Sequence, residues 1–197
     1  MQSQTTDILI VGVGGQGTLL TSRIIAQVAV QLGYDVKVSE VHGMAQRGGS
    51  VVTQVRYGKK IYSPIIKKGE ADVILAFEKI EAARWLDYLK ADGMVIINNE
   101  RVNPLPVMSG KAKYPEDIHE KVAALVEKTV VVDATDIAAR CGNVKAANVV
   151  LVGILSQAIG LPVEEVEKAI RAIVPGKALE VNQEAFREGR KLLEQTV

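Results

Sequence analysis

The chain has very few of the residues that build covalent frameworks, metal clusters and membrane spans. One cysteine, Cys141, is present among 197 residues, which excludes a disulfide within the chain and a cysteine-rich iron–sulfur or zinc site. No apolar run approaches the roughly 20 residues of a membrane span, and the opening MQSQTTD lacks the basic and apolar regions of a signal peptide. We therefore expect a cytoplasmic protein in which Cys141 is a small buried residue near a helix end.

Excess charge and aromatic side chains are scarce as well. A net charge of +1 provides no global field for binding nucleic acid. Aromatic residues make up 4% of the chain, so aliphatic side chains must fill the core, for which a 48% hydrophobic content is ample. The length fits one domain over residues 1–197, and no repeat, low-complexity segment or linker divides it.

Familiar catalytic signatures are also missing. The sequence contains no G-x-x-x-x-G-K-[ST] phosphate loop, no G-x-S-x-G nucleophile elbow and no H-E-x-x-H zinc motif. It also lacks the Gly-Asp-Gly signature of thiamine diphosphate binding. We therefore assign no catalytic and no metal-binding residue, and expect no self-contained catalytic machinery.

The stretch Asp7–Gly17 (DILIVGVGGQG) is the most informative feature that is present. The apolar run Ile8–Val11 predicts a buried strand, the four glycines after it predict a tight turn, and the amphipathic segment Thr18–Leu32 predicts a helix. Free N–H groups at the start of that helix would favour an anion. The glycines satisfy the dinucleotide pattern G-x-G-x-x-G. The turn either meets a ligand phosphate or a partner's backbone, or only allows close strand–helix packing.

A second polar and glycine-rich stretch, EVHGMAQRGGSV, begins at Glu40. Glu40 lies 23 residues after Gly17, about where a dinucleotide-binding fold places the acid that holds ribose hydroxyls; it would otherwise pair with Arg47 or cap a turn. Arg47 stands beside Gly48 and Gly49, a combination that can offer donors to a phosphate or carboxylate. The alternative is a solvated arginine in a turn.

The order of the remaining segments predicts the fold class. Strand and helix patterns alternate along most of the chain, which favours an α/β fold with a three-layer, Rossmann-like, mainly parallel sheet. Two features modify it: an inserted β-hairpin, with Val51–Tyr57 and Lys60–Ile66 as its strands, and a helical C-terminal third. Within that third, Ala146–Ile159 is apolar nearly all round and should be buried.

Five segments in order resemble the gamma subunit or domain of the 2-oxoacid:ferredoxin oxidoreductases, and together they cover almost the whole chain. They are most similar to the small (beta) subunit of indolepyruvate:ferredoxin oxidoreductase. The segments are GVGGQG, EVHGMAQRGGSV, GEADVILAFEKIEAARWL, KAANVVLVGILS and LEVNQEAFREGR.

The resemblance implies one subunit of an enzyme that decarboxylates a 2-oxoacid oxidatively, passing the acyl group to coenzyme A and the electrons to ferredoxin. It also implies that thiamine diphosphate, Mg and iron–sulfur clusters belong to a large (alpha) partner subunit, and that this chain is inactive alone. The net charge and the absence of long apolar runs lead us to expect no binding to nucleic acid or a membrane. Asn148 either contributes to the site or serves as a buried side-chain cap or in a helix–helix hydrogen bond. The candidates for a coenzyme A contact or the subunit interface are Gly12, Gly14, Gly15, Gln16, Gly17, Glu40, Arg47, Gly48, Gly49 and Asn148.

Two alternatives stay open. The chain could be the gamma subunit of a pyruvate or 2-oxoglutarate:ferredoxin oxidoreductase. In a different class, it could be a free-standing protein that binds NAD or FAD through the glycine turn and Glu40. The extra glycine at Gly15 and the expected hairpin argue against the second alternative.

Overall fold

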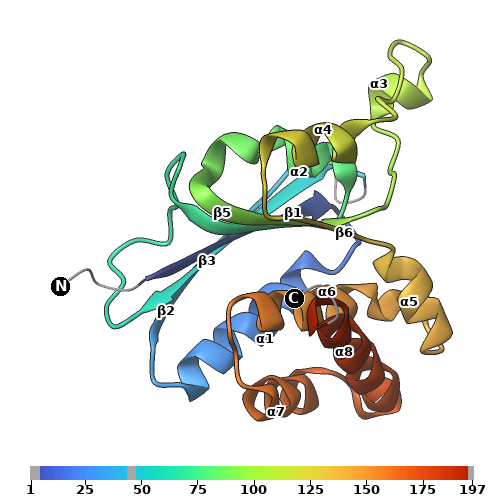
Figure 1. Ribbon diagram of the computed structural model, residues 1–197. Coiled ribbons are helices and arrows are strands. Elements are labelled where there is room, and N and C mark those ends of the chain that lie inside the picture. The colour runs from blue at the N-terminus through green and yellow to red at the C-terminus, as the bar shows by residue number, and fades with distance from the viewer. Residues whose placement is uncertain (1–4, 44–47, 195–197) are drawn as a thin grey trace.

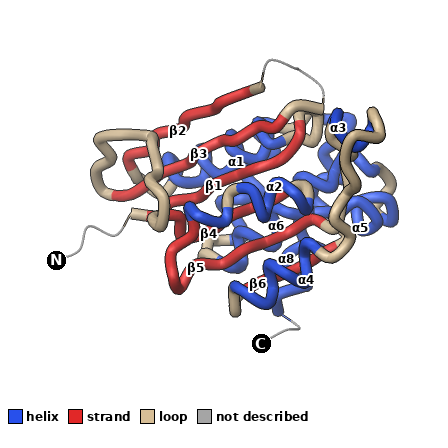
Figure 2. Tube along the Cα trace, turned by 90° about the horizontal axis from the view of Figure 1, so that it is seen from above, coloured by secondary structure: helices blue, strands red, loops and turns tan. Residues whose placement is uncertain are grey.

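The computed structural model describes residues 5–43 and 48–194. A six-stranded sheet in the order β2-β3-β1-β4-β5-β6 lies between two layers of helices (Figure 1), with β2 and β6 at its edges (Figure 2). This is the expected three-layer α/β fold. The strands are β1 (Thr6–Val13), β2 (Asp35–His42), β3 (Ser50–Gly58), β4 (Ala71–Ala76), β5 (Leu89–Asn98) and β6 (Thr129–Val132).

The sheet is mixed because of one strand. β1, β4, β5 and β6 run parallel, whereas β3 lies between β1 and β2 and is antiparallel to both. The predicted strand at Val51–Tyr57 is confirmed, but the predicted return strand Lys60–Ile66 is wrong, since that segment forms no strand. Both edges of β3 are already occupied, and Pro64 has no N–H group for a further ladder. The inserted hairpin is instead made by β2 and β3.

The central strand β1 is buried on both faces. Ile8, Leu9, Ile10 and Val11 have no exposed surface, as expected for a strand covered by helices on each side. Ile8 and Ile10 pack toward the face that holds α1 (Thr18–Gln31), while their neighbours pack toward the face that holds α2 and α4.

The helices divide unevenly between the two faces (Figure 1). The face opposite α1 carries α2 (Lys79–Arg84), α4 (Ile118–Leu125) and the projecting short helix α3 (Leu105–Met108). The other face carries α1 and the rest, and no helix in the described ranges is long and apolar enough to cross a membrane. The remaining helices on that face are α5 (Ala134–Arg140), α6 (Ala147–Ala158), α7 (Val163–Ile173), α8 (Leu179–Glu194) and the short 3₁₀ turns η2 (Val144–Ala146) and η3 (Gly176–Ala178). The 3₁₀ turn η1 (Leu86–Tyr88) follows α2 and packs on the α2 face.

Helix α6 is the buried helix that the sequence predicted. Every residue from Asn148 to Ser156 is buried, because the sheet covers one side and α8 covers another. Two glycines let the backbones of α6 and α8 touch: a Cβ at Gly153 would lie 2.3 Å from the Phe186 carbonyl oxygen, and one at Gly189 would lie 2.1 Å from that of Val150. This contact fixes the N-terminal end of α6 beside the glycine turn.

Candidate functional site

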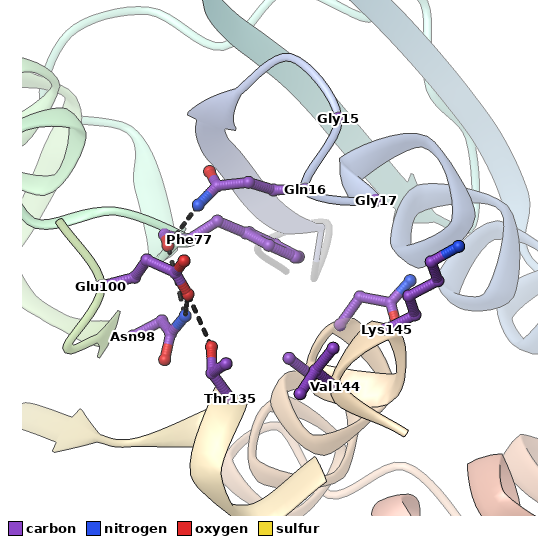
Figure 3. A pocket seen from close by; sticks show the side chains of 11 residues that line it. Gly15, Gln16, Gly17, Phe77, Asn98, Glu100, Thr135, Val144 and Lys145 are labelled. Carbon is purple, nitrogen blue, oxygen red and sulfur yellow. Dashed lines mark hydrogen bonds between the residues drawn. The ribbon is translucent and has the colours of Figure 1, made fainter. Parts of the chain in front are cut away.

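A cleft of about 480 Å³ opens at the carboxyl ends of the parallel strands (Figure 3). In open α/β sheets this edge is where ligands bind. The β1–α1 turn forms one wall, the ends of β4 and β5 with the start of α5 form another, and the η2–α6 junction forms a third. The lining residues are Gly15, Gln16, Gly17, Phe77, Asn98, Glu100, Thr135, Val144, Lys145, Ala147 and Asn148.

The glycine turn presents bare backbone to the cleft at two positions. Gly15 has φ +104° with no heavy atom within 4 Å of a Cβ, and Gly17 has φ +93°. Gly17 is also the N-cap of α1, which has no side-chain cap and no acidic residue in its first turn. No side chain therefore offsets the positive end of the helix dipole, and the first N–H groups of α1 can donate hydrogen bonds to an anion.

Three members of the turn have structural roles. A Cβ at Gly12 would lie 2.9 Å from both Gln16 Oε1 and Phe77 Cβ, so this glycine allows close packing. Gln16 lines the cleft, but its amide is already engaged: Oε1 accepts from Val13 N (2.8 Å) and Nε2 donates to the Phe77 carbonyl (3.1 Å). Gly14 donates its N–H to the carbonyl of Gly49 at 2.9 Å.

That last bond brings the two predicted glycine loops together, although only the first lines the cleft. Gly49 accepts this hydrogen bond through its carbonyl. Gly48 is exposed with φ +75°, and no heavy atom lies within 4 Å of the position of a Cβ there. Arg47 lies outside the described residues. Glu40 is on the edge strand β2, where Oε1 lies 3.3 Å from His42 Nε2, and it does not line the cleft. A dinucleotide-binding fold places its second strand directly beside the first, whereas β3 separates them here.

Asn148 and Lys145 stand beside the turn, at the start of α6. The Asn148 side chain is buried (5% exposed), and its Nδ2 lies 2.5 Å from the position of a Cβ on Gly17. Its Oδ1 has no hydrogen-bond partner within the described residues. Buried polar atoms are almost always paired, and this oxygen can accept a hydrogen bond from a ligand or a water molecule. Lys145, which the sequence reasoning missed, adds a positive charge to the same wall.

The opposite wall holds a carboxylate that the sequence reasoning also missed. Glu100 Oε2 accepts hydrogen bonds from Thr135 Oγ1 (2.5 Å) and Asn98 Nδ2 (3.2 Å). Asn98 is held in turn, because its Oδ1 accepts from the backbone N–H of Ala134 (3.0 Å). Asn98 ends β5, Glu100 comes two residues later, and Thr135 comes three residues after the end of β6. The rule that ligands bind at the carboxyl ends of strands was therefore the signal that could have found them.

A buried carboxylate anchors the floor of the cleft from behind. Glu78 follows Phe77, is 1% exposed and caps α2 by accepting from the N–H groups of Ile80 (2.6 Å) and Glu81 (3.1 Å). Its other oxygen accepts from Tyr114 Oη at 2.5 Å. Burial and, next, the hydrogen bond to Glu78 raise the pKa of Tyr114 well above its ordinary value, which keeps this hydroxyl a donor at every working pH.

The arrangement suits binding better than bond-breaking. Lys145 and Glu100 make no ion pair with any residue in the described part of the chain, so each charge is available to a ligand. Neither described histidine lines the cleft. Across residues 5–43 and 48–194, no group of three or more His, Cys, Asp or Glu could hold a metal ion. The cleft offers an anion site on one wall and a hydrogen-bond acceptor on the other.

Comparisons with known proteins show the family to which the chain is similar. The sequence profile of the family described as pyruvate ferredoxin/flavodoxin oxidoreductase matches residues 7–192. The indolepyruvate oxidoreductase subunit IorB of Pyrococcus horikoshii is 44% identical over 192 residues, which are 94% of each chain.

Two solved structures share the fold. The pyruvate oxidoreductase subunit PORC of Thermotoga maritima aligns with a TM-score of 0.72 and 24% identity over 95% of this chain and 96% of that one. The 2-oxoglutarate:ferredoxin oxidoreductase of Magnetococcus marinus, determined with 2-oxoglutarate, coenzyme A and succinyl-CoA bound, aligns with a TM-score of 0.75 and 20% identity. The match covers all of this chain but 32% of that longer one.

Proposed function

Because the chain belongs to the pyruvate ferredoxin/flavodoxin oxidoreductase family, we propose that it is the small subunit of an indolepyruvate:ferredoxin oxidoreductase. The complex would decarboxylate an aryl pyruvate oxidatively, pass electrons to ferredoxin and transfer the acyl group to coenzyme A. The near full-length match to the Pyrococcus horikoshii subunit carries the choice of substrate. Fold likeness to the Thermotoga maritima and Magnetococcus marinus proteins supports pyruvate or 2-oxoglutarate only as second candidates.

The contribution of this chain is to hold a phosphate of coenzyme A in the cleft. The uncapped start of α1, with Gly15 and Gly17 at positive φ, supports this assignment, as does the unpaired Oδ1 of buried Asn148. Lys145 adds charge attraction. Backbone N–H groups at a helix start bind phosphate without side-chain reorganisation, so a coenzyme would be oriented as well as retained. Gly12, Gly14 and Gly49 support the turn from behind the cleft.

Thiamine diphosphate, Mg and the iron–sulfur clusters are assigned to the large subunit. When bound there they supply the decarboxylation and the path for electrons. The residues described here do not fit them, because no group of three or more candidate metal ligands is formed and the lone described cysteine, Cys141, stands apart from the cleft. In this division of labour the small subunit binds and orients a co-substrate.

Co-expression with the large subunit tests the proposal. The purified pair should reduce ferredoxin in the presence of coenzyme A and indolepyruvate, and turn over pyruvate and 2-oxoglutarate far more slowly. The large subunit alone serves as the control and should be inactive. A large subunit that is fully active without this chain would contradict the proposal, and a preference for pyruvate would replace indolepyruvate with the second candidate.

A further inference from the structure

We propose that Glu100 makes the cleft selective, so that it takes a phosphate ester bearing a hydroxyl or amino donor and rejects a bare polyphosphate. The inference rests on the proposed function, because it presumes that the opposite wall binds phosphate. It adds the chemical class of the group attached to that phosphate.

The carboxylate of Glu100 is fixed in place. Thr135 Oγ1 and Asn98 Nδ2 both donate to Oε2, at 2.5 and 3.2 Å, which leaves Oε1 without a hydrogen bond from any described residue. Both donors are neutral. Neither donor therefore offsets the charge of the carboxylate, and no ion pair within residues 5–43 and 48–194 does so.

The position of the carboxylate decides what it can meet. Figure 3 shows Glu100 on the side of the cleft away from Lys145 and Gly17, with Phe77 between the two sides in this view. A ligand whose phosphate lies at the glycine turn would bring its other end toward Glu100. A second anion there would be repelled, whereas a hydroxyl or amino group would donate to Oε1 in a charge-assisted hydrogen bond.

A nucleoside phosphate has this chemistry. Its phosphate carries the negative charge, and its ribose hydroxyls and base amino group are donors. Val144, which is 54% exposed, offers an apolar surface on the same cleft. Applied to coenzyme A, the inference places the nucleotide end in this cleft and leaves the thiol arm to reach the partner subunit.

Calorimetric titration of the co-purified complex with two probes tests the role of Glu100. Adenosine 5′-diphosphate and inorganic pyrophosphate share a diphosphate but differ in the donors attached to it. The wild-type complex should bind the nucleotide roughly tenfold or more tightly than pyrophosphate. In Glu100→Gln the side-chain oxygen would accept from Thr135, and the amide NH₂ would then face the ligand. That NH₂ is a donor and cannot accept a hydrogen bond from the hydroxyl or amino group of the ligand. The preference should fall roughly tenfold, with pyrophosphate binding unchanged or tighter.

Two further variants separate the possible outcomes. Glu164→Gln, on an exposed position of α7, is the matched control and should leave both affinities unchanged. Thr135→Val should reduce the preference by a smaller factor by loosening the carboxylate, and it replaces Glu100→Gln if that variant does not fold. An unchanged preference in both Glu100→Gln and Thr135→Val overturns the inference.

Lys145→Ala distinguishes failure of the inference from failure of the proposed function. If it weakens both probes while Glu100→Gln changes neither, the phosphate site stands and the role of Glu100 is wrong. If the wild-type complex binds neither probe, the cleft is not an anion site, and both proposals fall.

Discussion

Ser50 Oγ donates a hydrogen bond to Glu81 Oε2 at 2.5 Å, which joins the first residue of β3 to helix α2. Glu81 is 4% exposed, and its other oxygen accepts from Arg84 Nε at 3.1 Å. Gly49, next to Ser50, holds the N–H of Gly14. The glycine turn is therefore braced from the opposite layer of the fold, through a second loop that does not itself line the cleft.

Replacing Ser50 with Ala should loosen this brace. Loss of one hydrogen bond to a buried carboxylate is expected to reduce the free energy of unfolding by about 1–2 kcal/mol and to raise the KM for coenzyme A several-fold, with kcat little changed. Urea denaturation and steady-state kinetics of the complex measure the two effects. Ser109→Ala, at an exposed position, is the control. A loss of stability with no change in KM would show that the Ser50–Glu81 hydrogen bond stabilises the fold but does not affect coenzyme A binding.

Replacing Lys145 with Ala should weaken coenzyme A binding directly. Lys145 lines the same cleft as Gly17, the N-cap of α1, and its ammonium group has no ion-pair partner in the described part of the chain. We expect a rise in KM for coenzyme A of roughly tenfold at unchanged kcat, and a smaller difference at high salt. Lys168→Ala on α7 (Val163–Ile173) is the control. Equal kinetics in the two variants would count against the phosphate site.

Two alanine variants in the glycine turn should differ in a defined way. Gly15 has φ +104° and open space around it. Gly15→Ala should therefore introduce backbone strain but no clash, and lower the free energy of unfolding by about 1 kcal/mol. Gly17 has φ +93°, and its Cβ would also meet Asn148 Nδ2 at 2.5 Å and Cβ at 3.2 Å. Gly17→Ala should cost about 2–4 kcal/mol. Denaturant titration of both variants checks which one loses more stability. Equal losses would mean that the Asn148 side chain moves aside to make room for the new Cβ.

The parts of the fold that the sequence predicted are those governed by local pattern. Glycines after the apolar run Ile8–Val11 specify a turn wherever the strand lies, and the fully apolar segment around Gly153 has to be buried. The family assignment from the five ordered segments is confirmed. The order of strands cannot be predicted in this way. Lys60–Ile66 was expected to return as a strand after Val51–Tyr57, but it finds no open edge beside β3.

The site was only partly predictable for the same reason. Gly15, Gly17 and Asn148, which the sequence analysis named as candidates for a coenzyme A contact or the subunit interface, line the cleft. A turn and the helix packed on it can be placed from local sequence, but the role of these residues stays a prediction. Glu40 does not, because its strand is moved outward by β3. Glu100 and Thr135 follow different strands and meet only when β5 and β6 pair. Spacing along the chain holds no sign of that contact.

The thiol of Cys141 should react slowly. Cys141 is the C-cap of α5 and is partly buried. Burial, followed by the Glu184 and Glu188 carboxylates, raises its pKa above the ordinary value for a thiol, which lowers the fraction of reactive thiolate at pH 8. Alkylation by iodoacetamide should therefore be several-fold slower in the folded protein than in urea, with Cys141→Ser as the blank. Equal rates would mean that the thiol is more accessible than the structure shows.

Asp35 should make stability depend on pH in the acid range. Its carboxylate accepts from the Ile61 N–H (2.9 Å) and from Lys37 Nζ (2.8 Å), tying the start of β2 to the segment after β3. Chiefly through the Ile61 hydrogen bond, and then that of Lys37, the pKa of Asp35 is lowered from 3.8 to about 2. A lowered folded-state pKa stabilises the protein above the unfolded value, near 4, and that stabilisation is lost as the pH falls toward 2.

The variant Asp35→Asn isolates this contribution. It should be less stable than the wild type at pH 7, and the difference should shrink between pH 4 and pH 2 until the two urea midpoints converge, because the wild-type carboxyl is then protonated as well. Asp92→Asn, at an exposed position with no ion pair among the described residues, controls for the general effect of removing a charge. A stability difference that stays constant from pH 7 to pH 2 would show that the Asp35→Asn variant is destabilised by packing or strain. The hydrogen bonds of Asp35 would then not favour its charged form.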